Sequence, residues 1–185
     1  MKRTFIAIPI TPSPLLSSAI ADIKERLKDS RIRWARPEGL HVTLAFIGQT
    51  SADNEIRIKE ILSSLSHEIE PFSLAVESIG AFGKSTPKVL WVGITDINSS
   101  LNAAVTKLKA RLSENGIVVD SKPFTPHLTL GRIKELQAPE FSSMLAAYTS
   151  AHFQAVEVNE IAFYNSISQP NESPIYQPIS KVKLG

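Results

Sequence analysis

Apolar and polar positions along this chain follow two periods, and short strand-like segments are interleaved with longer helical ones. Patterns typical of β-strands are found at residues 4–10, 40–47, 72–79, 89–94, 117–119, 126–133, 155–163 and 175–184. The helical period is found at residues 14–28, 53–65, 99–112 and 140–147. This mixture favours a fold of strands and helices over an all-helical one.

The helical segments each place apolar residues on one face. In the first helix we expect these residues to turn inward: Leu15, Leu16, Ala19, Ile20, Ile23 and Leu27. In the second helix we expect the same of Ile56, Ile61, Leu62 and Leu65. Residues 80–88, which are rich in Gly, Ser and Pro, and the pair Asn115-Gly116 are predicted turns.

The order of elements in the first half of the chain recurs in the second half. No low-complexity linker separates the halves, so we expect one domain over residues 1–185 and not two independent ones. The predicted fold is α+β. Two pseudo-symmetric lobes, each an antiparallel sheet with helices outside, line a central groove.

One four-residue phrase occurs twice, as His41-Val42-Thr43-Leu44 and as His127-Leu128-Thr129-Leu130, each within a predicted strand. Alternation along a strand directs the His and Thr of each phrase to one face and the two apolar residues to the core. Two of only four histidines lie in such a phrase. For an average composition the odds of this coincidence are on the order of one in a thousand, so we expect a shared site.

Composition narrows the cellular setting. The chain has 185 residues, 21% of them charged, no cysteine and a net charge of +2. No apolar run approaches the roughly 20 residues that cross a bilayer, and the absence of cysteine is compatible with a reducing cytoplasm. We expect a cytoplasmic monomer without a membrane partner. Since the net charge is small, any nucleic-acid binding must use a local basic patch.

Two histidines and two threonines facing one small anion suit acid and base chemistry on a phosphate ester. Histidine has an ordinary pKa near 6.5, so one imidazole can be neutral and the other protonated near neutral pH. The neutral one takes a proton from water, and the protonated one gives a proton to the leaving oxygen. Threonine hydroxyls can donate to the phosphate oxygens. This scheme requires no metal and no cofactor.

The paired phrases resemble the signature of the 2H phosphoesterases, and the surrounding sequence resembles the RNA 2',3'-cyclic phosphodiesterases, also called 2'-5' RNA ligases. The resemblance extends over residues 5–8, 33–34, 40–48, 80–82, 89–93 and 123–132, and more weakly over 165–166 and 174–176. It implies a 2H phosphoesterase fold that hydrolyses a terminal 2',3'-cyclic phosphate on RNA to a 2'-phosphomonoester. Ligation through a 2'-5' bond is the reverse reaction at the same site.

The resemblance also implies a role for each residue of the site. His41 is then the proton donor to the 3' oxygen, and His127 is the proton acceptor that activates water. Thr43 and Thr129 bind the phosphate, and Arg132 is in the place of an arginine that meets it. Residue 131 is Gly, where the family commonly has Ala.

Other interpretations stay open. The enzyme could act on small nucleotides such as ADP-ribose cyclic phosphate or 2'-5' oligoadenylate, or the groove could bind RNA ends without turnover. Basic residues Arg33, Arg36 and Lys122 are candidates for contacts to backbone phosphates. Trp34 is a candidate for base stacking, although a packing role is favoured, as it is for Phe82 and Trp91. A zinc site on His41 and His127 is disfavoured because no third ligand has a suitable spacing.

Overall fold

The computed structural model describes residues 1–83, 86–120, 122–170 and 172–185. Its strands are β1 (Lys2–Pro9), β2 (Arg31–Trp34), β3 (His41–Thr50), β4 (Phe72–Phe82), β5 (Val89–Thr95), β6 (His127–Glu135), β7 (His152–Val158), β8 (Glu160–Ile167) and β9 (Ile175–Lys183). Its helices are α1 (Pro14–Arg26), α2 (Ala52–Ser66), α3 (Ser100–Glu114) and α4 (Phe141–Ala146), with a 3₁₀ turn at Pro37–Gly39.

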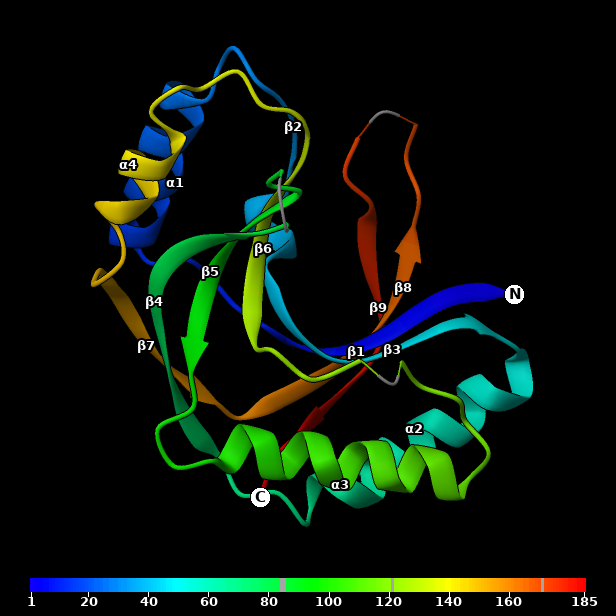
Figure 1. The fold of residues 1–185 in the computed structure, drawn as a ribbon. Coiled ribbons are helices and arrows are strands. Elements are labelled where there is room, and N and C mark those ends of the chain that lie inside the picture. The colour runs from blue at the N-terminus through cyan, green and yellow to red at the C-terminus, as the bar shows by residue number, and fades with distance from the viewer. Residues whose placement is uncertain (84–85, 121, 171) are drawn as a thin grey trace.

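The strands form one sheet whose order is symmetric about its middle. The order is β7-β4-β5-β6-β3-β1-β8-β9, and every neighbouring pair is antiparallel (Figure 1). β6 corresponds to β3, β5 to β1, β4 to β8 and β7 to β9. Each lobe therefore takes strands from both halves of the chain.

The two lobes meet where β3 and β6 pair through Val42 and Leu128. His127 lies 86 residues after His41, and Leu128 lies the same number after Val42, so equivalent positions of the two halves face each other there. Val42 and Leu128 are fully buried. A pseudo-twofold axis passes between them, and the strands diverge on either side.

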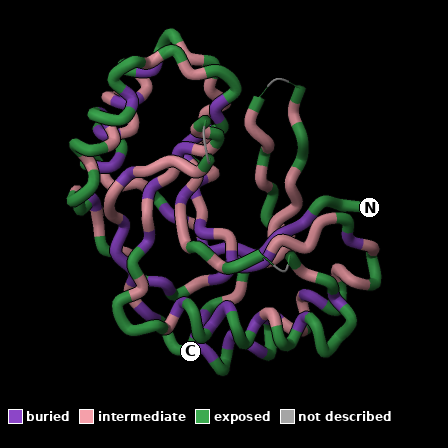
Figure 2. Tube along the Cα trace, in the orientation of Figure 1, coloured by how far each residue is buried: buried purple, intermediate pink, exposed green. Residues whose placement is uncertain are grey.

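Helices cover the outside of the sheet, away from the groove. α1 and α4 lie together at one side, and α2 and α3 run side by side below the sheet (Figure 1). Serine side chains cap α1 and α2, since Ser13 Oγ accepts from the Leu16 amide at 3.1 Å and Ser51 Oγ from the Asn54 amide at 3.2 Å. Buried positions gather on the central strands and the inner helix faces (Figure 2). No helix among the described residues is long and apolar enough to cross a membrane.

The fold class and the four helices predicted from the sequence are confirmed, but two inward positions are wrong. Leu15 is 57% exposed and Ile56 is 55% exposed. The buried face of α1 runs through Leu16, Ala19 and Ile23, and that of α2 through Ile58, Leu62 and Leu65. At 100° per residue, Leu15 lies beside its helix's buried face, and Ile56 lies on the side opposite Ile58.

The structure differs from the predicted strands and turns at several places. The predicted strand 155–163 is two strands, because the chain leaves β7 at Val158 and enters β8 at Glu160, where it pairs with the other lobe. Residues 80–82, predicted as a turn, continue β4. β2 was not predicted at all. Each His-x-Thr-x phrase lies at the start of its strand. Residues 84 and 85 of the predicted turn lie outside the described part.

Residues 117–119 do not form the predicted strand, because they complete the end of α3. The amide of Ile117 donates to Leu112 O at 2.9 Å and the amide of Gly116 to Ser113 O at 2.9 Å, with Gly116 at φ +72°. This is the Schellman arrangement, in which the apolar residue after the glycine packs back on the helix. Ile117 is accordingly buried, whereas Val118 is 84% exposed.

Packing of Trp91 on the bare backbone of Gly80 generates the first prediction. A Cβ at Gly80 would clash with the outer ring of the Trp91 indole. Gly80→Ala should therefore lower the free energy of unfolding by about 1–3 kcal/mol in urea denaturation. Adding Trp91→Phe removes the clashing ring atoms and should recover part of that loss. Strictly additive effects in the double-mutant cycle would contradict this contact.

Candidate functional site

The two His-x-Thr-x phrases lie on the two strands that meet at the pseudo-twofold axis. Because β3 and β6 are antiparallel at Val42 and Leu128, the residue before one lies beside the residue after the other. His41 is thus next to Thr129, and His127 is next to Thr43. The two imidazoles stand diagonally, on opposite sides of the axis. All four side chains line one groove of about 740 Å³.

Both imidazoles are oriented by the same backbone contact. His41 Nδ1 lies 2.7 Å from Gly39 O, and His127 Nδ1 lies 2.7 Å from Thr125 O. A carbonyl oxygen only accepts, so each Nδ1 carries the proton and donates. Nε2 of each ring is left for the groove. In a neutral imidazole that atom accepts a proton, and in a protonated one it donates.

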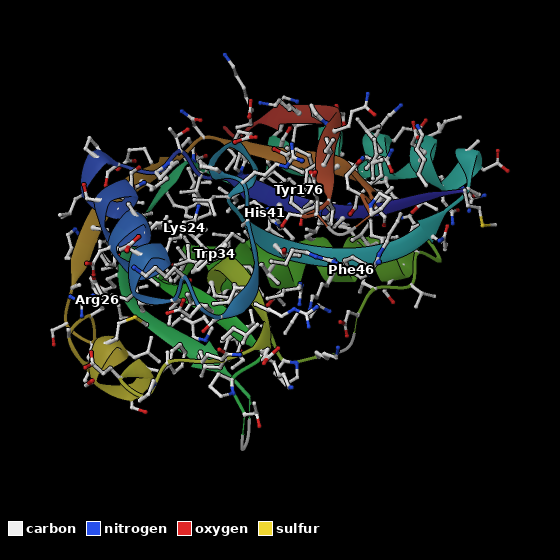
Figure 3. All side chains as sticks on the ribbon, turned by 90° about the horizontal axis from the view of Figure 1, so that it is seen from above. Lys24, Arg26, Trp34, His41, Phe46 and Tyr176 are labelled. Atoms are coloured by element: carbon white, nitrogen blue, oxygen red, sulfur yellow. The ribbon has the colours of Figure 1, made fainter. Side chains whose placement is uncertain are left out.

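Aromatic rings hold each imidazole from the side. The Tyr176 ring meets His41 edge to face, with centroids 4.9 Å apart, and Phe5 lies 4.8 Å from the same imidazole. Figure 3 shows His41 and Tyr176 side by side, on β3 and β9. On the other lobe, Phe82 meets His127 edge to face at 5.0 Å. These contacts restrict the rotation of both imidazoles.

The surroundings of His41 oppose its protonation. Burial lowers the pKa of the His41 imidazole below 6.5, its hydrogen bond to Gly39 O acts in the opposite direction, and the charge of His127 lowers it further. Without a ligand, the structure therefore favours neutral His41. An anion in the groove would favour the protonated form.

A β-bulge after each phrase brings one more side chain into the groove. The partners of β5 step from Thr129 to Gly131, so Leu130 is an extra residue in β6, and the alternation changes phase. Arg132 then faces the groove with His127 and Thr129. The same step at Leu44 in β3 brings Phe46 to the equivalent place on the other lobe.

The groove is basic. Among the described residues, five cationic side chains and two carboxylates line it. The cations are Arg3, Arg33, Arg36, Lys122 and Arg132, and the carboxylates are Glu38 and Asp120. Arg36 is ion-paired to Glu172 at 2.5 Å, which joins the β8–β9 hairpin to the segment after β2. The local basic patch that the sequence requires for nucleic-acid binding is present, although the net charge is only +2.

Of the candidate residues named from the sequence, most line the groove and Trp34 does not. His41, Thr43, His127, Thr129 and Arg132 lie together, and Arg33, Arg36 and Lys122 also line the groove. Trp34 does not, because it lies on the opposite face of β2, with the Lys24 ammonium 5.6 Å from its ring centroid (Figure 3).

Phe46 and Arg3 line the groove but were not singled out from the sequence. Phe46 lies within the His-x-Thr-x strand, but its direction depends on the bulge at Leu44. Arg3 is near the start of β1, five residues before Ile8, and its guanidinium lies 5.0 Å from the Phe46 ring centroid. In the sequence it is one of twenty lysines and arginines. Within the described ranges, no three His, Asp or Glu side chains are grouped so as to hold a metal ion.

Comparison with known proteins agrees with this geometry. The family model described as LigT like Phosphoesterase matches the chain twice, at residues 7–91 and 92–176. The chain belongs to this phosphoesterase family. The two matches coincide with the two halves of the pseudo-repeat, and each contains one His-x-Thr-x phrase.

Similar proteins include named hydrolases. One is the RNA 2',3'-cyclic phosphodiesterase of Archaeoglobus fulgidus, with 31% identity over 96% of this chain and 97% of the relative. Another is the Aquifex aeolicus protein of the same name, with 30% identity over 91% of this chain and 93% of the relative. The chain is accordingly an enzyme of the hydrolase class.

Solved structures share the fold. A protein of Thermus thermophilus superposes with a TM-score of 0.78 at 24% identity, covering 98% of this chain and 97% of that one. E. coli LigT complexed with 3'-AMP superposes with a TM-score of 0.75 at 23% identity, covering 99% and 98%. The arrangement of two lobes around a groove is therefore that of the family.

The burial of His41 generates a pH prediction. The midpoint for its imidazole in a proton NMR titration should lie below 6.5, and His127→Gln should raise it by removing a nearby positive charge. Because the unfolded chain binds this proton more readily, the free energy of unfolding should fall as pH drops below 6.5. His41→Gln should lack this part of the pH dependence. A wild-type midpoint above 6.5 would contradict the assignment.

Proposed function

We propose that this enzyme is an RNA 2',3'-cyclic phosphodiesterase that hydrolyses a terminal cyclic phosphate to a 2'-phosphomonoester. The observation that carries the proposal is the diagonal pair of imidazoles, each with Nδ1 bound to a backbone carbonyl and Nε2 left for the groove. The names of the full-length relatives support the same reaction. The basic groove supports a nucleotide anion as substrate.

The reaction is a single displacement at phosphorus. A water oxygen forms a bond to phosphorus while the bond to the 3' oxygen breaks, so the phosphate stays on the 2' oxygen. His127 Nε2 takes the proton of the attacking water, and His41 Nε2 gives its proton to the departing 3' oxygen. Diagonal placement suits this step, because the attacking and leaving oxygens are then on opposite sides of phosphorus.

The negative charge of the substrate favours the protonated form of His41. Burial lowers the pKa of the His41 imidazole in the free enzyme, whereas a proton donor must be protonated. A phosphodiester anion close to the imidazole favours its charged form and raises that pKa. Substrate binding therefore increases the fraction of His41 that is protonated and can act as the acid. The direction of proton flow in this proposal is the one that the family resemblance implies.

Three further side chains are placed to hold the phosphate. The hydroxyls of Thr43 and Thr129 share the groove face with the imidazoles, and Arg132 reaches it through the bulge at Leu130. Hydroxyl and guanidinium donors stabilise the charge that builds on the non-bridging oxygens during attack. Phe46, at the equivalent place on the other lobe, offers an aromatic surface to the nucleoside.

The same site would also carry 2'-5' ligation. Attack of a 5' hydroxyl in place of water on the cyclic phosphate forms a 2'-5' bond with the same two imidazoles. In dilute aqueous solution water greatly outnumbers RNA ends, so hydrolysis should dominate.

The principal test is turnover of an oligoribonucleotide ending in a 2',3'-cyclic phosphate, with EDTA present. Wild type should form the 2'-phosphate and no 3'-phosphate. His41→Ala and His127→Ala should each lower kcat by roughly 10²–10⁴-fold, because each imidazole carries one proton transfer. His67→Ala is the matched control, since His67 ends α2 and does not line the groove, and it should be active.

Three results would contradict the proposal in different ways. Formation of 3'-phosphate would reverse the assignment of the leaving oxygen. Turnover of ADP-ribose cyclic phosphate or 2'-5' oligoadenylate without turnover of RNA would favour the small-nucleotide enzyme. Tight binding of the RNA end without product would favour a binding module.

The two threonines give a narrower prediction. Thr43→Val and Thr129→Val remove a hydroxyl with little change of shape, and each should lower kcat by about 10–10³-fold, since one donor to the transition state is lost. KM should change less, because the charge builds up after binding. A change in KM alone, with kcat unchanged, would assign the threonines to ground-state binding instead.

A further inference from the structure

Two arginines face each other across neighbouring strands at one end of the groove. β2 pairs with β6 so that Arg33 is directly opposite Arg132, and both side chains line the groove. Like charges in directly opposed positions destabilise a sheet. No ion pair joins either guanidinium to a carboxylate within the described residues. The juxtaposition has a structural cost, and an anion would offset it.

Arg33 lies farther from the two imidazoles than Arg132 does. Its partner Arg132 lies four residues beyond Leu128, which marks the pseudo-twofold axis, and four strand residues span about 13 Å. In the proposed function Arg132, on β6 itself, holds the phosphate between the histidines. Arg33, one strand further out, is displaced from the axis.

The surroundings of Arg33 hold β2 firmly in place. Gly131 lets the strand approach, since a Cβ there would lie 2.8 Å from Ile32 and 3.2 Å from Trp34. The Ala35 amide donates to Leu130 O at 2.7 Å, and Ser173 Oγ donates to the carbonyl of Trp34. Arg33 therefore projects from a fixed strand whose Trp34 packs on the opposite face.

Among the described residues, one lobe has such a strand and the other does not. The segment equivalent to β2 in the other half is residues 117–120, which make one backbone contact with β3, from the Asp120 amide to Phe46 O at 3.1 Å. The guanidinium pair thus makes one end of the groove different from the other. The other nearby arginine, Arg36, is already paired to Glu172.

We propose that Arg33 forms a second phosphate subsite, which binds the phosphate on the 5' side of the terminal nucleoside. This inference rests on the proposed function and deepens it. The chemistry recognised is a phosphodiester anion one nucleotide upstream of the cyclic phosphate. The enzyme then recognises the end of a polynucleotide. It discriminates against nucleoside 2',3'-cyclic phosphates, which lack this upstream phosphate.

The experiment compares three substrates, each ending in a 2',3'-cyclic phosphate. They are adenosine 2',3'-cyclic phosphate, the dinucleotide ApA with this end, and the same dinucleotide with a methylphosphonate in place of the phosphate between the nucleosides. The methylphosphonate keeps both nucleosides and removes the charge. Wild type should prefer normal ApA over both others in kcat/KM by about tenfold, as a hydrogen bond to a charged group allows. Arg33→Gln should abolish the preference over the methylphosphonate.

The matched control is Arg31→Gln. Arg31 is on the same strand but pairs with Glu135 and does not line the groove, so this variant should keep the wild-type preference. Salt gives a second readout. The slope of log kcat/KM for ApA against log salt should decrease in magnitude by about 0.7 in Arg33→Gln, the value for one phosphate contact of a single strand.

The outcomes separate the two proposals. If wild type hydrolyses all three substrates at equal kcat/KM, the second subsite is wrong and the proposed function stands. If Arg33→Gln lowers kcat/KM equally for all three, Arg33 acts on the cyclic phosphate together with Arg132, and the subsite is again wrong. If wild type hydrolyses none of them, the proposed function fails and the subsite fails with it.

Discussion

The structure depends on one contact, the antiparallel pairing of Val42 with Leu128 where equivalent strands of the two halves meet. Antiparallel pairing about a pseudo-twofold axis forces the residues before and after this pair into a diagonal arrangement. Two copies of one phrase are therefore enough to place an imidazole and a hydroxyl at each side of one point. Since the apolar residues of both phrases are buried beneath that point, the core fixes the site from below.

Both halves also use the same means to orient their histidines and extend the site. Each Nδ1 donates to the carbonyl two residues earlier, and each strand has a bulge that brings one more residue into the groove. The symmetry is broken by what that residue is. It is Phe46 on one lobe and Arg132 on the other, and the Arg132 lobe has β2 beside it. A nearly symmetric frame thus holds an asymmetric substrate.

Much of this could be predicted from the sequence, because the repeated phrase and the two periods are local signals. The four helices, the α+β fold and the shared groove are confirmed. The break of the predicted strand 155–163 between β7 and β8 could not be foreseen, since both parts have the same period and differ only in their distant partners. The place of Phe46 could not be foreseen either, since a bulge is a property of paired strands. The roles of His41 and His127 stay predictions.

The most direct test of the account is the stereochemistry at phosphorus. A nucleoside 2',3'-cyclic phosphorothioate of one configuration would be hydrolysed in water labelled with oxygen-18, and the configuration of the product would be determined. Imidazoles on opposite sides of phosphorus predict one displacement and hence inversion. Retention would require two displacements through a covalent enzyme intermediate, and it would contradict the assignment of both histidines as proton carriers.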